Sequence, residues 1–434
     1  MKGFVTVSHP NIVIHDILSR IDEPINISVT GVQPGKVITL HLIKKLNGER
    51  YLASKASYTA DQEGIVDLGR QSPVQGSYQS VDHMGLFWSM EPVHLTEEIK
   101  CYIDQHQPSE PCDELSPQVS VLLLEMAGII VAHQAITRQW MSSDIENHSI
   151  QEEELIGSFF YHKDRKPRPA IIVLGGSEGG INEKTAALLA SHGFSVLAVA
   201  YFGIEKRQKQ LREIPLEYVE SALNWIKGRK EVQPGGIGIH GTSRGSELAL
   251  WSATLFPDIM ATVSLNGSAV SFCGIVPWTE EPTLPPAWTY QGQPLPYLQP
   301  DNPIELALEC KEMWVNRKGN PLRLWHDGLS KNVELLEKAT IPLEKMHGDL
   351  LMVSGLEDES WDSATLSALG FTKKMQAHPS GRSKHLKYEG AGHYIGIPYL
   401  RVISTDQRTR QQLAQASVDS WQETIKFYKQ VLCK

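Results

Sequence analysis

A buried strand that runs directly into the pentapeptide G-x-S-x-G constrains the fold of this chain more than any other feature. The segment Gly236–Gly245 begins with β-favouring apolar residues and ends in GTSRG, and a helix-forming run follows it through Trp251. A sharp turn between a strand and a helix holds a serine clear of its own backbone, where it can act as a nucleophile. Side chains at Gly241 and Gly245 would collide in such a turn. The segment therefore predicts an elbow with Ser243 at its tip.

An acid that could orient a histidine follows the serine in chain order, in a loop after a strand. The apolar run Asp349–Gly355 predicts that strand. The polar loop after it offers Asp358 as the orienting carboxylate. Three neighbouring carboxylates remain alternatives, namely Glu357, Glu359 and Asp362.

A histidine in the right place comes last. The run His385–Glu389 predicts the final strand, and the glycine-containing loop after it would bring His393 onto Ser243 as the base. Each residue alone has an ordinary explanation, because glycine-rich turns often hold serine, acidic loops are usually solvated, and the chain has 16 histidines. Their order, each after its own strand, indicates a Ser-His-Asp triad of Ser243, His393 and Asp358.

A second glycine-rich loop could stabilise an oxyanion. The predicted strand Pro169–Leu174 ends in the loop Gly175–Gly180, and an apolar helix follows. Such a loop exposes backbone N–H groups, and attack on a carbonyl requires donors of this kind. We assign the oxyanion hole to the backbone N–H of Arg244 and one from Ser177 or Glu178. A phosphate-binding loop is the alternative, but the segment lacks the Lys-Ser/Thr ending and the G-x-G-x-x-G spacing.

The 434 residues exceed what one hydrophobic core usually supports, which favours two domains. Short β-rich runs separated by turns extend from Ile25 to about Ala132 and predict a β-sandwich. From Glu152 onward strands alternate with helical stretches, as in a parallel α/β sheet. We therefore expect an N-terminal β-sandwich domain over 1–140 and a catalytic domain over 141–434. A proline- and aromatic-rich insertion at about 269–338 is expected to cover the active site.

Composition indicates a soluble cytoplasmic protein. There is no apolar run of membrane-spanning length, and Met1–Pro10 has no signal-peptide core. A net charge of −9 argues against general nucleic-acid binding. No motif indicates a cofactor or a metal, and nothing in the sequence specifies an oligomeric state. The cysteines are odd in number and form no CxxC pair, which fits reduced thiols: Cys101, Cys112, Cys273, Cys310 and Cys433.

Four stretches resemble the type I acyl-CoA thioesterases and bile acid-CoA:amino acid N-acyltransferase, and the likeness covers nearly the whole chain. The front stretch 82–92 resembles the family's P-M-G-L-L-W-x-x-x-P, with His83 where proline is usual. The others are similar to its G-x-S-K-G-x-E-L elbow, its I-P-x-E-K and G-x-D-D-x-x-W acid region, and its histidine loop: Gly241–Leu248, Ile341–Lys345 with Gly355–Trp361, and Gly392–Ile395.

The resemblance implies an α/β fold class, with a C-terminal α/β-hydrolase domain built on a mostly parallel doubly wound sheet. It also implies a preceding all-β, immunoglobulin-like sandwich. In that family the hydrolases use serine and the amino acid transferase uses cysteine, so Ser243 implies hydrolysis of an acyl-CoA substrate to a free acid and CoA. A carboxylesterase or dienelactone-type hydrolase, an N-acyltransferase and a non-catalytic binding protein remain alternatives.

A basic loop is the best candidate for holding the phosphates of CoA on so acidic a chain. It follows the predicted strand that ends at Ala200, and such loops line the same sheet edge as the elbow. Four cations stand close together in it: Lys206, Arg207, Lys209 and Arg212. The alternative is an ordinary solvated start to the next helix.

Overall fold

The computed structural model describes residues 9–46, 48, 50–106, 113–152, 154–276, 284–300, 302–316, 321, 331, 333–403 and 407–433. Most of the segment Met1–Pro10, Cys112 and parts of the predicted insertion lie outside these residues. The chain divides into two compact units, one of residues 1–142 with 397–415 and the other of residues 143–396 with 416–434.

The first unit is built on two β-sheets. A three-stranded sheet has the order β1 (Asn11–Ile14), β3 (Ile27–Thr30) and β6 (Val66–Asp67). A seven-stranded sheet has the order β2 (Leu18–Arg20), β10 (Ile129–Gln139), β9 (Gln118–Met126), β4 (Val37–Lys45), β5 (Tyr51–Thr59) and β7 (Gln75–Gly76), with β8 (Glu91–Val93) paired to β5. This unit also contains two helices, α1 (Gly85–Trp88) and α2 (Glu97–His106).

The sequence alternation that predicts this unit reflects burial on one sheet face. Along β5, Ala56 and Tyr58 are fully buried, whereas Lys55 between Ser54 and Ala56 is exposed. A side-chain period of two residues produces such a pattern where one face of a sheet packs against a core. The β-rich runs between Ile25 and Ala132 therefore include β3, β4 and β9.

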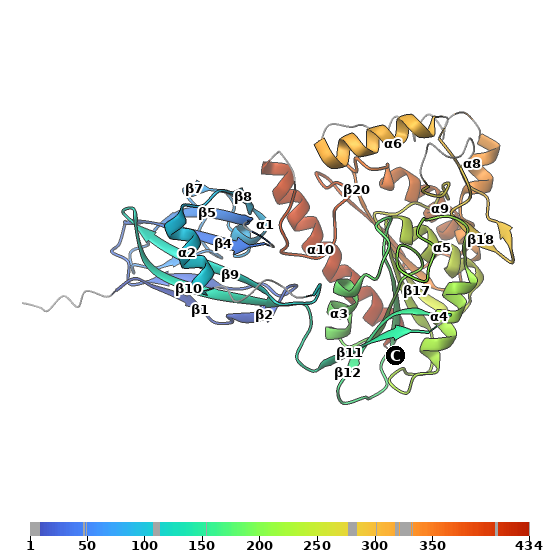
Figure 1. Cartoon of the computed structure of the whole chain (residues 1–434), viewed down its shortest axis with the longest axis horizontal. Helices are drawn as coiled ribbons and strands as arrows, with labels where there is room; N and C mark the ends of the chain where they lie inside the picture. The colour runs from blue at the N-terminus through green and yellow to red at the C-terminus, as the bar shows by residue number, and fades with distance from the viewer. Residues whose placement is uncertain are drawn as a thin grey trace, which may run out of the picture. The chain divides into compact units, whose positions relative to one another are not determined.

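The second unit contains one large sheet in the order β11-β12-β14-β13-β16-β17-β20-β21. Figure 1 labels β11, β12, β17 and β20 of this sheet. Neighbouring strands from β14 to β21 pair in parallel. Strand β12 pairs antiparallel with both of its neighbours, β11 and β14. The strands are β11 (Ile145–Gln151), β12 (Ile156–His162), β13 (Ala170–Leu174), β14 (Ser195–Val199), β16 (Ile237–Thr242), β17 (Ile259–Leu265), β20 (Asp349–Gly355) and β21 (Lys384–Tyr388). A small second sheet joins β15 (Ile214–Pro215), β18 (Trp288–Tyr290) and β19 (Gln293–Pro294).

Helices follow the strands of the large sheet as the α/β alternation predicts. They are α3 (Glu183–Ser191), α4 (Glu217–Lys227), α5 (Arg244–Leu255), α9 (Ser363–Ala377) and α10 (Gln407–Leu432), with a 3₁₀ turn η2 (Leu343–Lys345). The insertion contributes α6 (Pro303–Lys311), a π-helical turn η1 (Glu312–Asn316) and α8 (Val333–Ala339).

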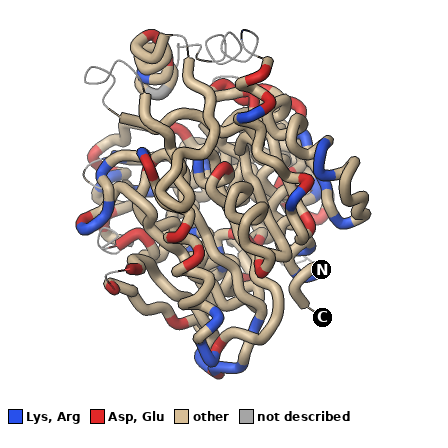
Figure 2. Tube along the Cα trace, turned by 90° about the vertical axis from the view of Figure 1, so that its right-hand side faces the viewer, with Lys and Arg blue, Asp and Glu red and all other residues tan. Residues whose placement is uncertain are grey.

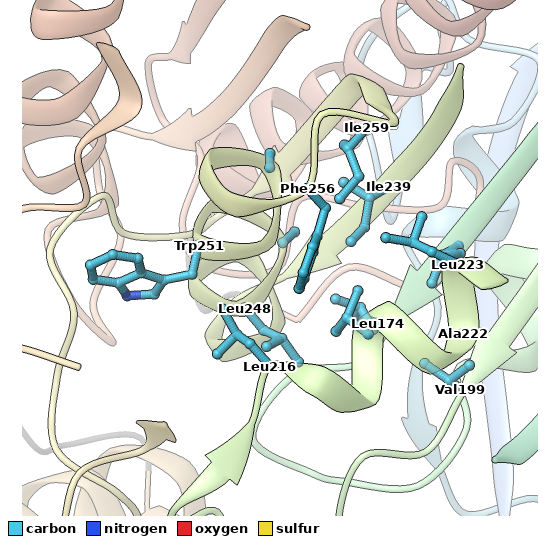
Figure 3. Close-up of a cluster of buried hydrophobic side chains, with 14 of the residues drawn as sticks. Leu174, Val199, Leu216, Ala222, Leu223, Ile239, Leu248, Trp251, Phe256 and Ile259 are labelled. Atoms are coloured by element: carbon cyan, nitrogen blue, oxygen red, sulfur yellow. The ribbon is translucent and has the colours of Figure 1, made fainter. Parts of the chain in front are cut away.

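Helices and strands share a continuous apolar core in this unit. Every residue of β13, β14 and β20 is buried, which requires cover on both faces of the sheet. Figure 3 shows Leu174, Leu223, Ile239 and Phe256 pointing toward one another from strand and helix segments. This packing gives the strand ends a rigid base on which loops can be held in fixed positions.

No helix in the described part of the chain combines the length and the apolarity that crossing a membrane requires. Figure 2 shows the positions of Lys and Arg interspersed with those of Asp and Glu along the Cα trace. Positive and negative side chains are therefore mixed along the chain despite the net charge of −9, and a basic loop can still form a locally positive surface.

We expect acid to destabilise the second unit through His240. This side chain is 2% exposed on β16, and burial lowers its pKa to about 4. Between pH 6.5 and 4 the unfolded chain binds a proton that the folded chain excludes, so stability falls as pH falls through this range. From pH 7 to pH 5 the free energy of unfolding should fall by about 2 kcal/mol, which guanidinium unfolding can measure.

The variant His240→Leu should lose that much less stability over the same pH interval. His347→Gln is the matched control, because it removes an exposed imidazole from the same unit and so tests the effect of losing a histidine that is not buried. Equal pH slopes for the wild type and His240→Leu would show that His240 is not the responsible group.

Candidate active site

The turn between β16 and α5 places Ser243 at its tip. Ser243 has a φ of +51° and a ψ of −119° and is the N-cap residue of α5. A Cβ at Gly241 would lie 2.3 Å from the carbonyl oxygen of Gly245, and a Cβ at Gly245 would lie 2.1 Å from that of Gly175. Both distances are far below van der Waals contact, so the elbow requires glycine at these two positions. A positive φ at serine is strained and is typical of functional sites.

Ser243, His393 and Asp358 form one chain of hydrogen bonds beyond the carboxyl ends of their strands. The Oγ of Ser243 lies 3.1 Å from Nε2 of His393. The Nδ1 of His393 lies 2.9 Å from Oδ2 and 3.0 Å from Oδ1 of Asp358. The Asp358 side chain is 1% exposed and that of His393 is 15% exposed. An imidazole that donates from Nδ1 to a carboxylate presents an unprotonated Nε2, so it can accept the seryl proton.

The other carboxylates of the acid loop lie elsewhere. Glu357 and Glu359 are exposed, whereas Asp358 between them is buried. Asp362 is the N-cap of α9, and its Oδ1 accepts the backbone N–H of Thr365 at 3.0 Å. Among the four candidates the structure therefore brings only Asp358 to the histidine.

The glycine loop after β13 approaches the same place. Ser177 and Glu178 line one cavity together with Ser243 and Arg244. The carboxylate of Glu178 accepts the N–H of Gly176 at 2.8 Å. Within the described residues the backbone N–H groups of Ser177 and Glu178 make no hydrogen bond, and Arg244 begins α5, where N–H groups have no intrahelical partner. These N–H groups can therefore donate to a ligand oxygen.

The cavity over Ser243 has a volume of about 820 Å³ and a largely apolar lining. Residues from two parts of the insertion line it: Cys273, Gly274 and Ile275 at its start, and Leu306, Ala307 and Cys310 on α6. Residues beside the triad complete the wall, among them Trp361, Tyr394 and Ile395. A cavity of this size can hold a sizeable apolar group next to a carbonyl at Ser243.

The sequence predictions missed a buried network around the side chain of Arg244. Its Nη2 donates to the carbonyl oxygens of Phe272 at 3.1 Å and Cys273 at 2.9 Å. Its Nε lies 3.3 Å from Oε1 of Glu247, and Oε2 of Glu247 accepts the indole N–H of Trp288 at 2.9 Å. Burial raises the pKa of Glu247 to about 7, against the opposing effect of Arg244. The network ties the elbow helix to the insertion, and the spacing of three between Arg244 and Glu247 was its one sequence signal.

The basic loop after β14 lies beside the glycine loop. The N–H of Gly180 donates to the carbonyl oxygen of Phe202 at 3.0 Å. The guanidinium of Arg207 packs 4.2 Å over the ring of a tyrosine in α4, while Lys206 and Lys209 are exposed. Two of the four cations are thus available to a ligand, and Arg207 has a packing role.

Thiols in the cavity are held protonated, since burial raises the pKa of Cys273 to about 12 and that of Cys310 to about 11. Among the described residues there is no group of three or more His, Cys, Asp or Glu side chains that could hold a metal ion. The hydroxyl of Ser243, by contrast, lies within hydrogen-bond distance of a base, the imidazole of His393.

Comparison with known proteins gives matches over nearly the whole chain. A family model described as the acyl-CoA thioester hydrolase/BAAT N-terminal region matches residues 22–152, and one described as the BAAT/acyl-CoA thioester hydrolase C terminal matches residues 214–434. Acyl-coenzyme A amino acid N-acyltransferase 1 of Mus musculus is 31% identical over 425 residues, with 95% of each chain covered.

Two relatives of another kind match over a similar span. Acyl-coenzyme A thioesterase 1 of Mus musculus is 27% identical, with 95% of this chain and 94% of that protein covered. The mitochondrial acyl-coenzyme A thioesterase 2 of the same organism is 27% identical, with 95% of this chain and 87% of that protein covered. On these matches, the chain belongs to the acyl-CoA thioester hydrolase/BAAT family.

Proposed function

We propose that the protein is a serine hydrolase that cleaves acyl-CoA thioesters to a free acid and CoA. The observation that carries the proposal is the hydrogen-bonded chain from Ser243 through His393 to Asp358, which opens on an apolar cavity. Relatives named acyl-coenzyme A thioesterases over the full length supply the substrate class. The reaction belongs to fatty acid metabolism.

The proposed mechanism assigns each residue one task. Ser243 Oγ attacks the thioester carbonyl while His393 Nε2 takes its proton, and Asp358 stabilises the imidazolium that forms. The backbone N–H of Arg244 and one from Ser177 or Glu178 stabilise the oxyanion. The proton on His393 passes to the CoA thiolate as the C–S bond breaks and an acyl-serine forms. His393 then activates water, which releases the acid and restores Ser243.

We propose that the insertion at about 269–338 forms a cap over the acyl group. Its described residues on α6 line the same cavity as Ser243. Apolar walls next to a nucleophile favour acyl chains over polar substrates, because the gain in free energy grows with the apolar area removed from water.

Release of free thiol from a panel of acyl-CoAs, measured beside release of p-nitrophenol from esters of the same acids, tests the function. A thioesterase should show a kcat/KM for its best acyl-CoA well above that for the matched ester. The reverse ranking would indicate a carboxylesterase or dienelactone-type hydrolase. A protein that a fluorophosphonate fails to label would be a binding protein with no active serine.

An N-acyltransferase is the second candidate, and the relatives of that name at 31% and 30% identity favour it. Transfer would use the same acyl-serine but pass the acyl group to an amine in place of water. Adding glycine or taurine to the assay and analysing the products by mass spectrometry separates the two, because a transferase forms the amide and a hydrolase forms the acid.

The proposed site for the CoA phosphates is the basic loop after β14. Reversal of its two exposed lysines, in the double variant Lys206→Glu/Lys209→Glu, should raise the KM for acyl-CoA several-fold at low salt. It should barely change turnover of a small neutral ester, and added salt should shrink the difference, since exposed charges are screened. Steady-state kinetics at two ionic strengths measures both effects.

A charge-matched control is Lys166→Glu/Lys230→Glu. Both lysines are exposed. Lys166 lies in the loop that leads into β13 and Lys230 in the loop that leads into β16, whereas Ser243 follows the carboxyl end of β16. The control should leave the KM for acyl-CoA unchanged. Equal effects of the two double variants would point to net charge alone and remove the loop from the CoA site.

The compartment that we propose is the cytoplasm. The four cysteines in the described part of the chain, Cys101, Cys273, Cys310 and Cys433, are free thiols, which is typical of reducing compartments. One of the relatives is described as mitochondrial. Fluorescence microscopy of the tagged full-length chain distinguishes the two locations.

A further inference from the structure

Asn266 connects to the loop that carries the base of the proposed triad. It directly follows β17, at the sheet edge where Ser243 lies, and its side chain is fully buried. Its Nδ2 donates to the carbonyl oxygen of His393 at 2.7 Å and to that of Ile395 at 3.0 Å. One side-chain amide therefore holds two carbonyl groups of the histidine loop.

The main chain at Asn266 reaches the other two loops. Its carbonyl oxygen accepts the indole N–H of Trp361 at 3.0 Å. The backbone N–H of Trp361 in turn donates to Oδ1 of Asp358 at 3.3 Å. The carbonyl oxygen of the preceding Leu265 accepts the backbone N–H of Ser243 at 2.8 Å. Two consecutive residues thus contact the elbow, the acid loop and the histidine loop.

The surroundings of residue 266 favour asparagine because its side-chain amide can donate two hydrogen bonds. Asn266 has a φ of +48°, a conformation that asparagine adopts more readily than most residues. Because both neighbours of the amide are carbonyl oxygens, its NH₂ group must face them. The Oδ1 accepts no hydrogen bond within the described residues, and leaving a buried acceptor unpaired costs free energy. Burial alone would not select such a side chain.

We propose that Asn266 is a positioning residue for the reaction. Its two hydrogen bonds fix the backbone of the histidine loop and so set the distance from Nε2 of His393 to Oγ of Ser243. The proposal rests on the proposed function, because it assigns His393 as the base. A displacement of about 1 Å between reacting groups can cost on the order of 100-fold in rate.

Two variants test the proposal. Asn266→Gly keeps the positive φ and removes the amide, while Asn266→Asp keeps the shape and turns a carboxylate oxygen toward two carbonyl oxygens. We expect kcat to fall by about 10- to 100-fold in each, with KM changed by less than about two-fold. The rate at which a fluorophosphonate labels Ser243 should fall in parallel, since it depends on the same base.

Ser367→Ala is the matched control. Ser367 is buried on α9, and its Oγ donates to the carbonyl oxygen of Gly267 at 3.1 Å. It therefore contacts the loop after β17 that holds Asn266, but among the residues that the structure describes it makes no hydrogen bond to the histidine loop. Its loss should leave kcat and the labelling rate within about two-fold of the wild type. Thermal unfolding of all three variants establishes that each is folded.

Wild-type turnover and labelling in folded Asn266→Asp and Asn266→Gly would overturn the proposal. A rise in KM with unchanged kcat would also overturn it, as would an equal fall of kcat in Ser367→Ala. Asn266→Asp, which preserves the packing, carries the test if the glycine variant does not fold. An unlabelled wild type or an active Ser243→Ala would instead show that the proposed function has failed, and the positioning role with it.

Discussion

Ser243→Ala should remove nearly all turnover of acyl-CoA while leaving the protein folded. Deleting the nucleophile of a Ser-His-Asp triad typically lowers kcat by roughly four to six orders of magnitude. The Oγ of Ser243 makes no capping hydrogen bond to α5, so its removal costs the helix no cap. Turnover by thiol release and folding by circular dichroism measure the two expectations.

His393→Ala should reduce turnover by a similar factor, because nucleophile and base act as a unit and their losses do not add. Thr242, a neighbour of Ser243 that also lines the cavity, provides the control, and Thr242→Ser should keep substantial activity. A tenth of wild-type activity remaining in Ser243→Ala would place the nucleophile elsewhere.

Asp358→Asn should be the second most damaging substitution, with a loss of up to about 10⁴-fold in kcat. The amide can occupy the space of the carboxylate, but it favours the wrong imidazole tautomer and leaves the imidazolium unstabilised. The Asp358 carboxylate lies 2.9 Å from Nδ1 of His393 and is buried, so solvent cannot replace it. The readout is kcat against pH for the wild type and the variant.

Glu357→Gln is the matched control, because it makes the same carboxylate-to-amide change one residue away on an exposed side chain. It should leave kcat within about two-fold of the wild type, since exposed charges contribute little. A larger loss in Glu357→Gln than in Asp358→Asn would move the acid by one residue.

Local patterns predict the elements of the second unit closely. The predicted strand Asp349–Gly355 has the bounds of β20, and the predicted strand Pro169–Leu174 matches β13 to within a residue. Strands buried on both faces are unbroken apolar runs, which a sequence displays directly. The same holds for one glycine of the elbow, because a Cβ at Gly241 would collide with the nearby Gly245. A Cβ at Gly245 would instead collide with Gly175, in the loop after another strand.

Contacts between distant segments escaped prediction. Residues 397–415 belong to the first compact unit although they follow the histidine loop. The N–H of Val402 donates to the carbonyl oxygen of Trp88 at 2.9 Å, and both Arg401 and Arg410 lie 2.9 Å from carboxylate oxygens of Glu91. Ion pairs separated by some 300 residues leave no periodic signal, so only folding reveals them.

The sequence by itself determined the candidates for the chemistry that we propose: a serine, an acid and a histidine in order, each just after an apolar run. Only the tertiary structure decided that Asp358 is the carboxylate turned inward, that Glu247 lies beside Arg244, and that Asn266 donates to the histidine loop. The physical reason is that strand formation follows from local hydrophobic pattern, whereas burial and hydrogen-bond distance depend on how loops from separate strands pack at one sheet edge.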